Sequence, residues 1–311
     1  MSHWDVLGIG CVAVDDLHYV EAYPAPDAKV RVRKRERHCG GLTATALVTA
    51  SRLGARCAFA GVLGDDEDSR FVLDALAREG VDVDPSVRRS SARPIRSTVL
   101  IDETHHTRTI FYDLAGTVGA DTESPPADVI TSARVLLIDH YGVEGMTRAA
   151  RIAREAGVAV VADFEHHEWP GFADLLALVD HLLVARPFAE QRTGTSSPEE
   201  AVARLWDAGR QLVAVTDGSA GCWYRDAGSP ARVIHQPAFA VPVRDTTGCG
   251  DVFHGAYAAA LARGVGADQR IRFASAAAAL KATRGGGQAG IPTRDEVERV
   301  LTRNTRKGAM L

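Results

Sequence analysis

Continuous apolar runs alternate with amphipathic segments along most of this chain of 311 residues. Runs such as RVLLID at 134–139 and AVVADF at 159–164 lack the apolar–polar alternation of a half-exposed strand. Because strands that are buried on both faces are apolar throughout, the pattern predicts an α/β fold, a mostly parallel sheet covered by helices on both faces. The predicted strands are 5–14, 57–62, 134–139, 159–164, 181–184 and 211–216. The predicted helices are 42–53, 69–79, 145–156, 198–209 and 256–262.

Two stretches, residues 14–37 and 95–112, break this rhythm because apolar and polar residues alternate there without a helical period. They are predicted to form half-exposed strands of a small antiparallel β sheet inserted into the larger unit. Length alone would permit one large domain or two smaller ones. We expect a single α/β domain over residues 1–300, followed by a C-terminal tail at 301–311.

Composition excludes some classes of protein. Apolar residues make up 46% of the chain, the formal net charge is −4, and the longest basic run is RVRKR at 31–35. These values argue against a nucleic-acid partner. Five scattered cysteines, an odd number without metal-ligand spacing, are typical of reduced thiols in a cytoplasmic protein. No segment has the length of a membrane span or the pattern of a secretion signal, so no membrane partner is expected.

The candidate chemistry is concentrated at 245–255, DTTGCGDVFHG. Gly248, Cys249 and Gly250 would leave successive backbone N–H groups accessible where an alanine-rich helix begins. A helix N-terminus attracts anions, so this segment is predicted to bind phosphate or a phosphoryl group in transfer. Asp251 would lie beside it and could accept the proton of an attacking hydroxyl. The alternative, a tight strand-to-helix turn without chemistry, stays open.

A second glycine pattern, GIGCVA at 8–13, matches the dinucleotide-binding spacing G-x-G-x-x-A. That spacing binds a nicotinamide cofactor only where a helix follows the turn directly. Here strand-like residues follow, and then Pro24 and Pro26. A dehydrogenase is therefore not expected.

The segment DTTGCGD closely resembles the C-terminal signature D-T-x-G-A-G-D of the ribokinase-like (PfkB) carbohydrate kinases, with Cys249 at the usual alanine position. Gly40 and Gly41 resemble the glycine pair that opens the first long helix of that family. The resemblance extends from about residue 6 to 297, and the last third is particularly similar to bacterial sulfofructose kinases. It implies a ribokinase-like fold with a β lid over the sugar, ATP and Mg²⁺ as cofactors, and a homodimer through the lid.

On the sugar side, the resemblance implies that the carboxylate of Asp15 accepts hydrogen bonds from sugar hydroxyls. Arginines on the lid would indicate an anionic group on the substrate if they face the site. The sulfofructose kinases place an arginine after the strand at 134–139, where this chain has Tyr141. The implied substrate-binding residues are Asp15, Gly40, Gly41, Thr45, Arg96, Arg108 and Tyr141.

On the nucleotide side, residues 216–221 resemble the family turn T-x-G-x-x-G that meets the ATP phosphates, and three residues of the last helices would flank adenine. The implied nucleotide-binding residues are Thr216, Gly218, Gly221, His254, Ala278 and Lys281. The Asn-x-x-Glu element that helps to organise Mg²⁺ in the family is aligned with ARPF at 185–188, and Glu190 is the nearest substitute.

Asp245 and Thr247, with carbonyl oxygens of the loop 281–290, resemble the family's monovalent-cation site, which implies K⁺. The alternative is that Asp245 only fastens a glycine-rich loop.

The resemblance and the anion site together predict an ATP-dependent sugar kinase that phosphorylates a primary hydroxyl of a ribose-type or ketohexose-type sugar. Two alternatives stay open. One is a kinase of an anionic ketose, such as sulfofructose or a sugar phosphate. The other is a regulator that binds sugar or nucleotide without catalysis.

Overall fold

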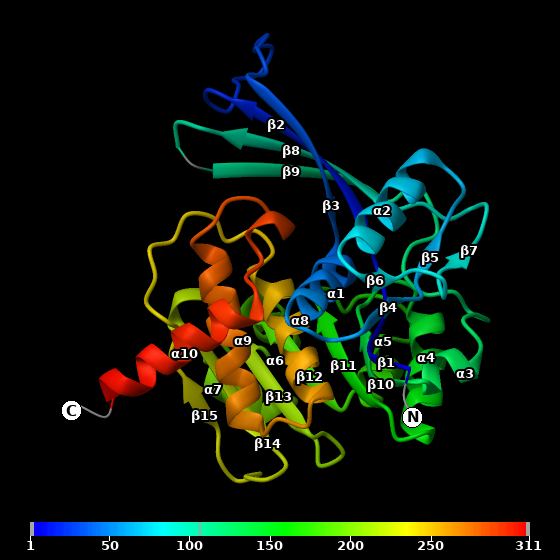
Figure 1. Cartoon of the computed structure of the whole chain (residues 1–311), viewed down its shortest axis with the longest axis vertical. Helices are drawn as coiled ribbons and strands as arrows, with labels where there is room; N and C mark the ends of the chain where they lie inside the picture. Colours follow the sequence, from blue (N-terminus) through cyan, green and yellow to red (C-terminus); the bar gives the residue numbers. More distant parts are fainter. Residues whose placement is uncertain (1–2, 106, 309–311) are drawn as a thin grey trace.

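The computed structural model describes residues 3–105 and 107–308, and they form a nine-stranded sheet, a four-stranded sheet and the helices around them (Figure 1). The large sheet has the strand order β15-β14-β13-β12-β11-β10-β1-β4-β6. Neighbours from β6 to β13 pair in parallel, and β14 and β15 add antiparallel strands at one edge. The mostly parallel sheet predicted from the sequence is confirmed. Its strands are β1 (Trp4–Ile9), β4 (Cys57–Phe59), β6 (Val81–Asp82), β10 (Ala133–Ile138), β11 (Ala159–Phe164), β12 (His181–Ala185), β13 (Leu212–Thr216), β14 (Cys222–Asp226) and β15 (Ile234–Gln236).

Helices cover both faces of this sheet because alternate residues of each strand point to opposite sides. Val6 of β1 packs in the cluster that holds helices α1, α8 and α9, whereas Leu7 packs with α4 and α5 on the other face. The helices are α1 (Leu42–Arg52), α2 (Glu67–Arg78), α3 (Ala127–Thr131), α4 (Val143–Glu155), α5 (Phe172–Ala177), α6 (Arg186–Thr193), α7 (Pro198–Leu205), α8 (Cys249–Ala262), α9 (Ala267–Ala282) and α10 (Arg294–Gly308), with short 3₁₀ turns at Gly218–Ala220 and Gln288–Gly290. None of the helices described is long and apolar enough to cross a membrane.

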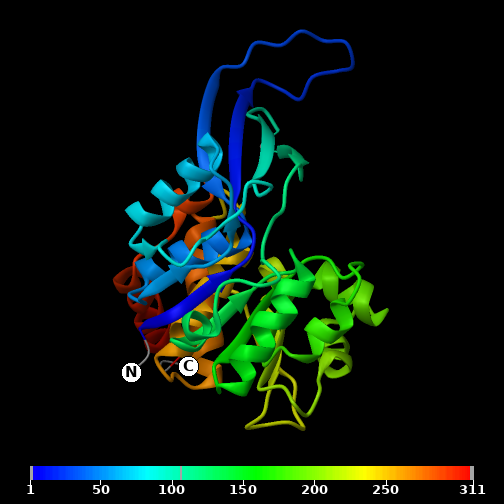
Figure 2. The same ribbon diagram turned by 90° about the vertical axis from the view of Figure 1, so that its right-hand side faces the viewer.

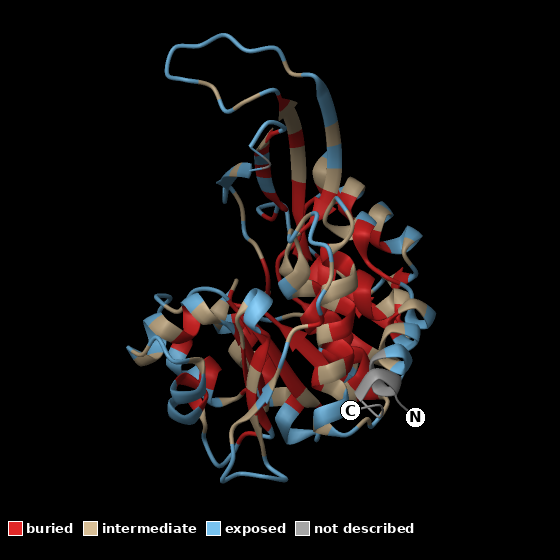
Figure 3. Cartoon of the chain, turned by 90° about the vertical axis from the view of Figure 1, so that its left-hand side faces the viewer, coloured by how far each residue is buried: buried red, intermediate tan, exposed pale blue. Residues whose placement is uncertain are grey.

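The four-stranded sheet, which we call the lid, projects from the body (Figure 2). Its order is β3-β2-β8-β9, with antiparallel pairing at both edges and parallel pairing between β2 and β8 in the middle. The loop between β2 and β3 lies at its far end and is exposed almost throughout (Figure 3). The lid strands are β2 (Ala13–Val20), β3 (Lys34–Gly40), β8 (Ile95–Asp102) and β9 (Thr107–Asp113), and a separate pair is formed by β5 (Val62–Leu63) and β7 (Val87–Arg88).

Two predicted boundaries are corrected by the structure. The strand expected at 5–14 is divided into β1 and β2 at Gly10, where a Cβ atom would lie 1.9 Å from Thr43 Oγ1 and 2.3 Å from Asp139 Oδ2. The chain therefore leaves the large sheet at Gly10 and enters the lid. The tail expected at 301–311 is not separate, because residues 301–308 continue α10; residues 309–311 lie outside the described part.

Helices α1 and α8 lie in close contact, and this contact brings their N-termini together. A Cβ atom at Gly255 of α8 would lie only 2.1 Å from the carbonyl oxygen of Ala46 in α1, so only glycine permits this approach. Helix α1 begins after Gly41 and helix α8 begins after Gly248, and both glycines have a positive φ. The two helix starts therefore open into the same space below the lid.

Candidate active site

A cavity of about 170 Å³ lies between the lid and the N-termini of α1 and α8. Residues that the sequence singled out for the sugar and for phosphoryl transfer converge on it although they come from four separate parts of the chain. They are Asp15, Gly40, Gly41, Thr45, Arg108, Gly248 and Asp251. Asp245 and Thr247 also line it, together with the glycine-rich residues 286–288.

Asp251 lies in the first turn of α8, beside this cavity. Burial raises the pKa of Asp251 well above the ordinary range of a carboxyl, and the negative charges of Asp163, Glu165 and Asp15 raise it further. A carboxylate with a raised pKa holds a proton more firmly, which suits a general base that takes a proton from a hydroxyl near neutral pH.

The second carboxylate of the cavity, Asp15, lies on β2 opposite His38 of β3. Burial raises the pKa of Asp15, although a hydrogen bond from the Ser97 hydroxyl and the nearby imidazole of His38 oppose the shift. A Cβ atom at Gly40 would lie 2.1 Å from Asp15 Oδ2, so the absence of a side chain there leaves room for the carboxylate. The adjacent Asp16 is instead paired with Arg37 at 2.8 Å on the exposed side of the lid.

The start of α1 adds backbone and a hydroxyl to the cavity. Gly41 has φ 94° and a Cβ atom there would lie 2.7 Å from the Cα of Val12, so two constraints require glycine. Thr45 is buried and lines the cavity one turn further along.

The structure separates the two lid arginines and moves Tyr141 away from the cavity. Arg108 of β9 lines the cavity and its guanidinium lies 3.9 Å from Asp245 Oδ1. Arg96 of β8 points to the outside, where its Nε lies 3.0 Å from Asp68 Oδ2, so a contact between Arg96 and a sugar in the cavity is not supported. Tyr141 packs beside Cys11 and Ile95 rather than among the residues that line the cavity.

The anion site at the start of α8 has fewer free backbone N–H groups than the sequence predicts. The N–H of Cys249 donates to the carbonyl of Thr246 at 3.2 Å. In the first helical turn, the N–H groups of Gly250 and Asp251 have no carbonyl four residues back within the helix, so they can turn to an anion, although the N–H of Asp251 also interacts with its own carboxylate. Burial raises the pKa of the Cys249 thiol, and the charge of Lys281 only partly opposes this, so the protonated thiol is favoured there.

On the nucleotide side, Thr216 ends β13 and the turn 218–221 follows it directly. Gly218 and Gly221 have positive φ values of 48° and 103°, conformations that favour glycine. Glu190 does not face an open metal site, because its Oε1 accepts a hydrogen bond from Arg186 at 2.7 Å. The same guanidinium donates to Asp217 at 3.0 Å and so joins the start of α6 to the turn after β13.

Two of the three residues expected beside adenine lie elsewhere. His254 is a core residue: its Nδ1 lies 2.8 Å from the carbonyl oxygen of Gly250 and 3.1 Å from Asp163 Oδ2, and its Nε2 lies 2.9 Å from the carbonyl oxygen of Leu183. Lys281 is fully buried at the end of α9. Ala278 is partly exposed on α9, and its contact with adenine stays a prediction.

Lys281 is directed into the loop where a monovalent cation was expected. Its Nζ donates to the carbonyl oxygen of Asp245 at 3.0 Å and to that of Arg284 at 3.3 Å. The Asp245 carboxylate accepts from the N–H of Thr247 and from the N–H of Gly286, each at 2.8 Å. Burial alone would raise the pKa of Asp245, but the hydrogen bonds from Thr247 and the charge of Lys281 lower it below its ordinary value.

Sequence reasoning missed the carboxylates Asp163 and Glu165, which act on Asp251 electrostatically. Both lie where β11 ends, and the carboxyl ends of parallel strands are where ligands of open α/β sheets bind. Their position at the end of a predicted strand could have identified them from the sequence. Within the described residues, no group of three or more His, Cys, Asp or Glu side chains forms a metal site.

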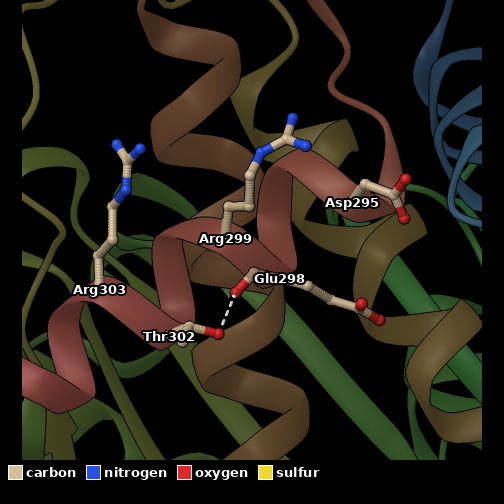
Figure 4. Close-up of a pocket in the computed structure, with 5 residues that line it drawn as sticks. All are labelled: Asp295, Glu298, Arg299, Thr302 and Arg303. Carbon is tan, nitrogen blue, oxygen red and sulfur yellow. Dashed lines mark hydrogen bonds between the residues drawn. The ribbon is translucent and has the colours of Figure 1, made fainter.

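A larger hollow of about 470 Å³ lies on the outside of α10 (Figure 4). The side chains that line it come from one helix only, and no separate parts of the chain converge there. They are Asp295, Glu298, Arg299, Thr302 and Arg303. This hollow is a surface depression and not a second active site.

A carboxylate beside a phosphate-binding helix N-terminus, under a lid that can exclude water, is what an enzyme needs to move a phosphoryl group onto a hydroxyl. Residues 5–294 match the family model described as pfkB family carbohydrate kinase, and the chain belongs to this family. It is therefore a phosphotransferase with an alcohol group as acceptor.

Two curated relatives agree with this assignment. The chain is 28% identical to the ribokinase of Haemophilus influenzae over 300 residues, which cover 93% of this chain and 95% of the relative. It is 30% identical to fructokinase-1 of Zea mays over 298 residues, which cover 84% of this chain and 88% of the relative.

Two solved structures share the fold. A putative ribokinase from Agrobacterium tumefaciens has a TM-score of 0.89 and 29% identity, with 97% of this chain and 99% of that chain covered. The ribokinase of Arabidopsis thaliana, whose structure is described as complexed with ribose and ATP, has a TM-score of 0.84 at 24% identity, with 97% and 99% covered.

Proposed function

We propose that this protein is an ATP-dependent kinase that phosphorylates a primary hydroxyl of ribose or of a ketohexose. The observation that carries the proposal is that Asp15 and Asp251 line one cavity at the N-terminus of α8. The cavity volume of about 170 Å³ is below the roughly 300–1,000 Å³ of sites for larger ligands, which suits a single sugar. Ribokinases and a fructokinase among the relatives support the same substrate classes.

In this proposal Asp15 and the backbone at Gly41 hold the sugar so that one hydroxyl lies next to Asp251. The Asp251 carboxylate takes the proton of this hydroxyl, and the N–H groups of Gly250 and Asp251 stabilise negative charge on the phosphoryl group. The turn 216–221 binds the nucleotide phosphates. Closure of the lid excludes water and so limits hydrolysis of ATP.

Mg²⁺ bound to the ATP phosphates would neutralise part of their charge. Such an ion keeps several waters and needs only one or two carboxylates from the protein. Glu165 fits this requirement because it is exposed at the end of β11 and its charge reaches Asp251. Glu190, expected for this role, is paired with Arg186. We therefore assign the Mg²⁺ water contact to Glu165.

The chain is proposed to act as one α/β domain with the lid as an insertion, in the cytoplasm, where its five cysteines would stay reduced. All five are free thiols in the structure.

The proposal is tested with purified protein, ATP and Mg²⁺ on a panel of neutral sugars and anionic ketoses, by measuring ADP release and the phosphorylated product. Turnover of ribose or of a neutral ketohexose is the expected result. Sugar binding without ADP release across the panel would reject the proposal in favour of a regulator, and ADP release without a phosphorylated sugar would reject it in favour of ATP hydrolysis.

An anionic ketose is the second candidate, and the position of Arg108 on the cavity favours it. Because a charged hydrogen bond contributes about 1.5–3 kcal/mol, Arg108→Ala would raise KM for an anionic sugar about tenfold or more. Arg96→Ala is the matched control, since Arg96 is a lid arginine that points away from the cavity. If both variants keep the wild-type KM, the anionic candidate is rejected.

A further inference from the structure

The ammonium of Lys281 occupies an unusual position for a lysine. The residue is fully buried, in a chain where most cationic side chains reach solvent. Its stem passes beside Gly290, where a Cβ atom would lie 2.8 Å from the Lys281 Cδ. A buried ammonium is stable only where oxygen atoms replace its water.

Those atoms form an oxygen-lined position at the end of α9. The carbonyl oxygens of Asp245 and Arg284 accept hydrogen bonds from Nζ at 3.0 and 3.3 Å, and the Asp245 Oδ2 lies 3.9 Å away. Lys281 is in the last turn of α9, where the negative end of the helix dipole also favours a cation. Carbonyl oxygens with one carboxylate are the ligands that suit a weakly hydrated monovalent cation.

A potassium ion does not fit here together with this side chain. The Asp245 carbonyl already accepts from Nζ, and a second cation bound to the same oxygens would lie beside the ammonium and be repelled by it. We propose that the Lys281 ammonium is the monovalent cation of this loop, so that the kinase carries a built-in substitute for K⁺ and works without it.

The positive charge of Lys281 lies where it can support the proposed phosphoryl transfer. Asp245 fastens both Thr247, at the turn that leads into α8, and Gly286, at the edge of the cavity. The positive charge of Lys281 also acts on Cys249 and Asp251 in the first turn of α8. The ammonium therefore holds the turn in place and adds positive potential behind the anion site.

The first experiment uses the wild-type protein, whose melting temperature and kcat/KM are compared in chloride salts of potassium, sodium and tetramethylammonium at equal ionic strength. Equal values in all three salts are the expected result. A rise of about threefold or more in kcat/KM, or a clear rise in Tm, with potassium alone would overturn the proposal. The Tm comparison remains decisive even if no sugar is phosphorylated, so it does not depend on the proposed function.

The second experiment uses Lys281→Met, which keeps the stem and removes the charge. In tetramethylammonium it should lose Tm and at least about tenfold in kcat/KM, as expected for the loss of charged hydrogen bonds. Potassium should restore both values, because the vacated oxygens can then bind the ion. A variant with wild-type values in tetramethylammonium, or one that potassium does not restore, would overturn the proposal.

Arg210→Met is the matched control. Arg210 is also buried, and its guanidinium donates to the carbonyl oxygens of Val179 and Leu176 at 2.8 and 2.9 Å. Val179 and Leu176 pack with α4 and α5, on the face of the sheet opposite to α1 and α8, and none of the three residues lines the cavity. Its loss should lower Tm equally in all three salts. Rescue of this control by potassium would show a general salt effect and would count against the proposal.

Discussion

Asp251 connects stability and catalysis at the level of a single side chain. Asp251→Asn keeps the shape and removes the proton acceptor, so kcat should fall by roughly 10² to 10⁴ while the Kd values for sugar and ATP change little. Steady-state kinetics and calorimetry check these two effects. Asp16→Asn is the control, because Asp16 lies next to Asp15 but on the exposed side of the lid. A near-normal kcat in Asp251→Asn would remove this residue from the role of base.

The same substitution should stabilise the fold. The pKa of Asp251 is raised in the folded state, so the protonated carboxyl contributes stability at low pH that is lost as pH rises through the folded pKa. An asparagine is neutral at every pH and avoids this loss. The expected rise in Tm at pH 7 is about 2 °C, and it should disappear in acidic buffer.

Glu165 should control the pH at which the enzyme loses activity. The base works only as a carboxylate, so kcat/KM falls when pH drops through the raised pKa of Asp251. Glu165 contributes to that raised pKa, and Glu165→Gln should therefore move the acid limb to lower pH.

The pH profile of kcat/KM measures this shift. Glu168→Gln is the matched control, since Glu168 is an exposed glutamate of the same loop that does not contribute to the pKa of Asp251. A shift to higher pH, or the same shift in both variants, would contradict the assignment. A loss of Mg²⁺ affinity in Glu165→Gln alone would additionally support its proposed water contact.

At the level of elements, Gly40 couples strand β3 to the sugar site. Because a Cβ atom at Gly40 would lie 2.1 Å from Asp15 Oδ2, Gly40→Ala must displace this carboxylate. KM for the sugar should rise about tenfold, as expected when a charged hydrogen bond is lost, with a smaller effect on kcat. In the control Gly266→Ala, the added methyl group meets no atom within 4 Å and both parameters should stay normal. An unchanged KM in Gly40→Ala would show that Asp15 does not hold the sugar.

The sequence predicts those elements that depend on local pattern. The apolar run at 159–164 coincides with β11. The helix predicted at 42–53 begins where α1 begins and ends one residue after it. The period of two along β8 also shows that Arg96 and Ser97 lie on opposite faces. It does not show which face meets the sugar, because this depends on the pairing of β8 with β2, where Ser97 lies opposite Asp15.

Among the site residues, those that are neighbours in sequence can be predicted, and those that meet only through packing cannot. DTTGCGD identifies the anion site because the glycines, the helix start and Asp251 are neighbours in sequence. The ammonium of Lys281 could not be placed, because its surroundings are formed by Asp245, Arg284 and Gly290, which meet only after α9 has packed. His254 was misplaced for a similar reason: its partners lie on β11 and β12, far away in the chain.

At the level of the whole molecule, the lid has an apolar surface that the single chain does not cover. Ile110, Phe111 and Tyr112 of β9 are 47%, 52% and 61% exposed; Ile110 lies on the cavity side of the lid, and Phe111 points to the opposite face. Strand β9 is an edge strand whose outer hydrogen-bonding groups are unpaired within the lid. Exposed apolar side chains on an edge strand favour association with a second strand or sheet. We therefore propose that the protein forms a homodimer through the lid.

Light scattering after size exclusion should give a mass twice that of the 33.2 kDa chain. Phe111→Glu would introduce a charge into the proposed contact, so it should produce monomers and raise KM for the sugar, because β9 carries Arg108 over the cavity. Trp169→Glu changes an exposed aromatic residue of comparable size that lies outside the lid, at 45% exposure, and should leave the dimer intact. A wild-type monomer would reject the dimer, and a dimer that persists in Phe111→Glu but dissociates in Trp169→Glu would place the contact elsewhere. Since the lid strands cover the sugar cavity, dissociation should alter sugar binding before it alters the stability of the α/β body.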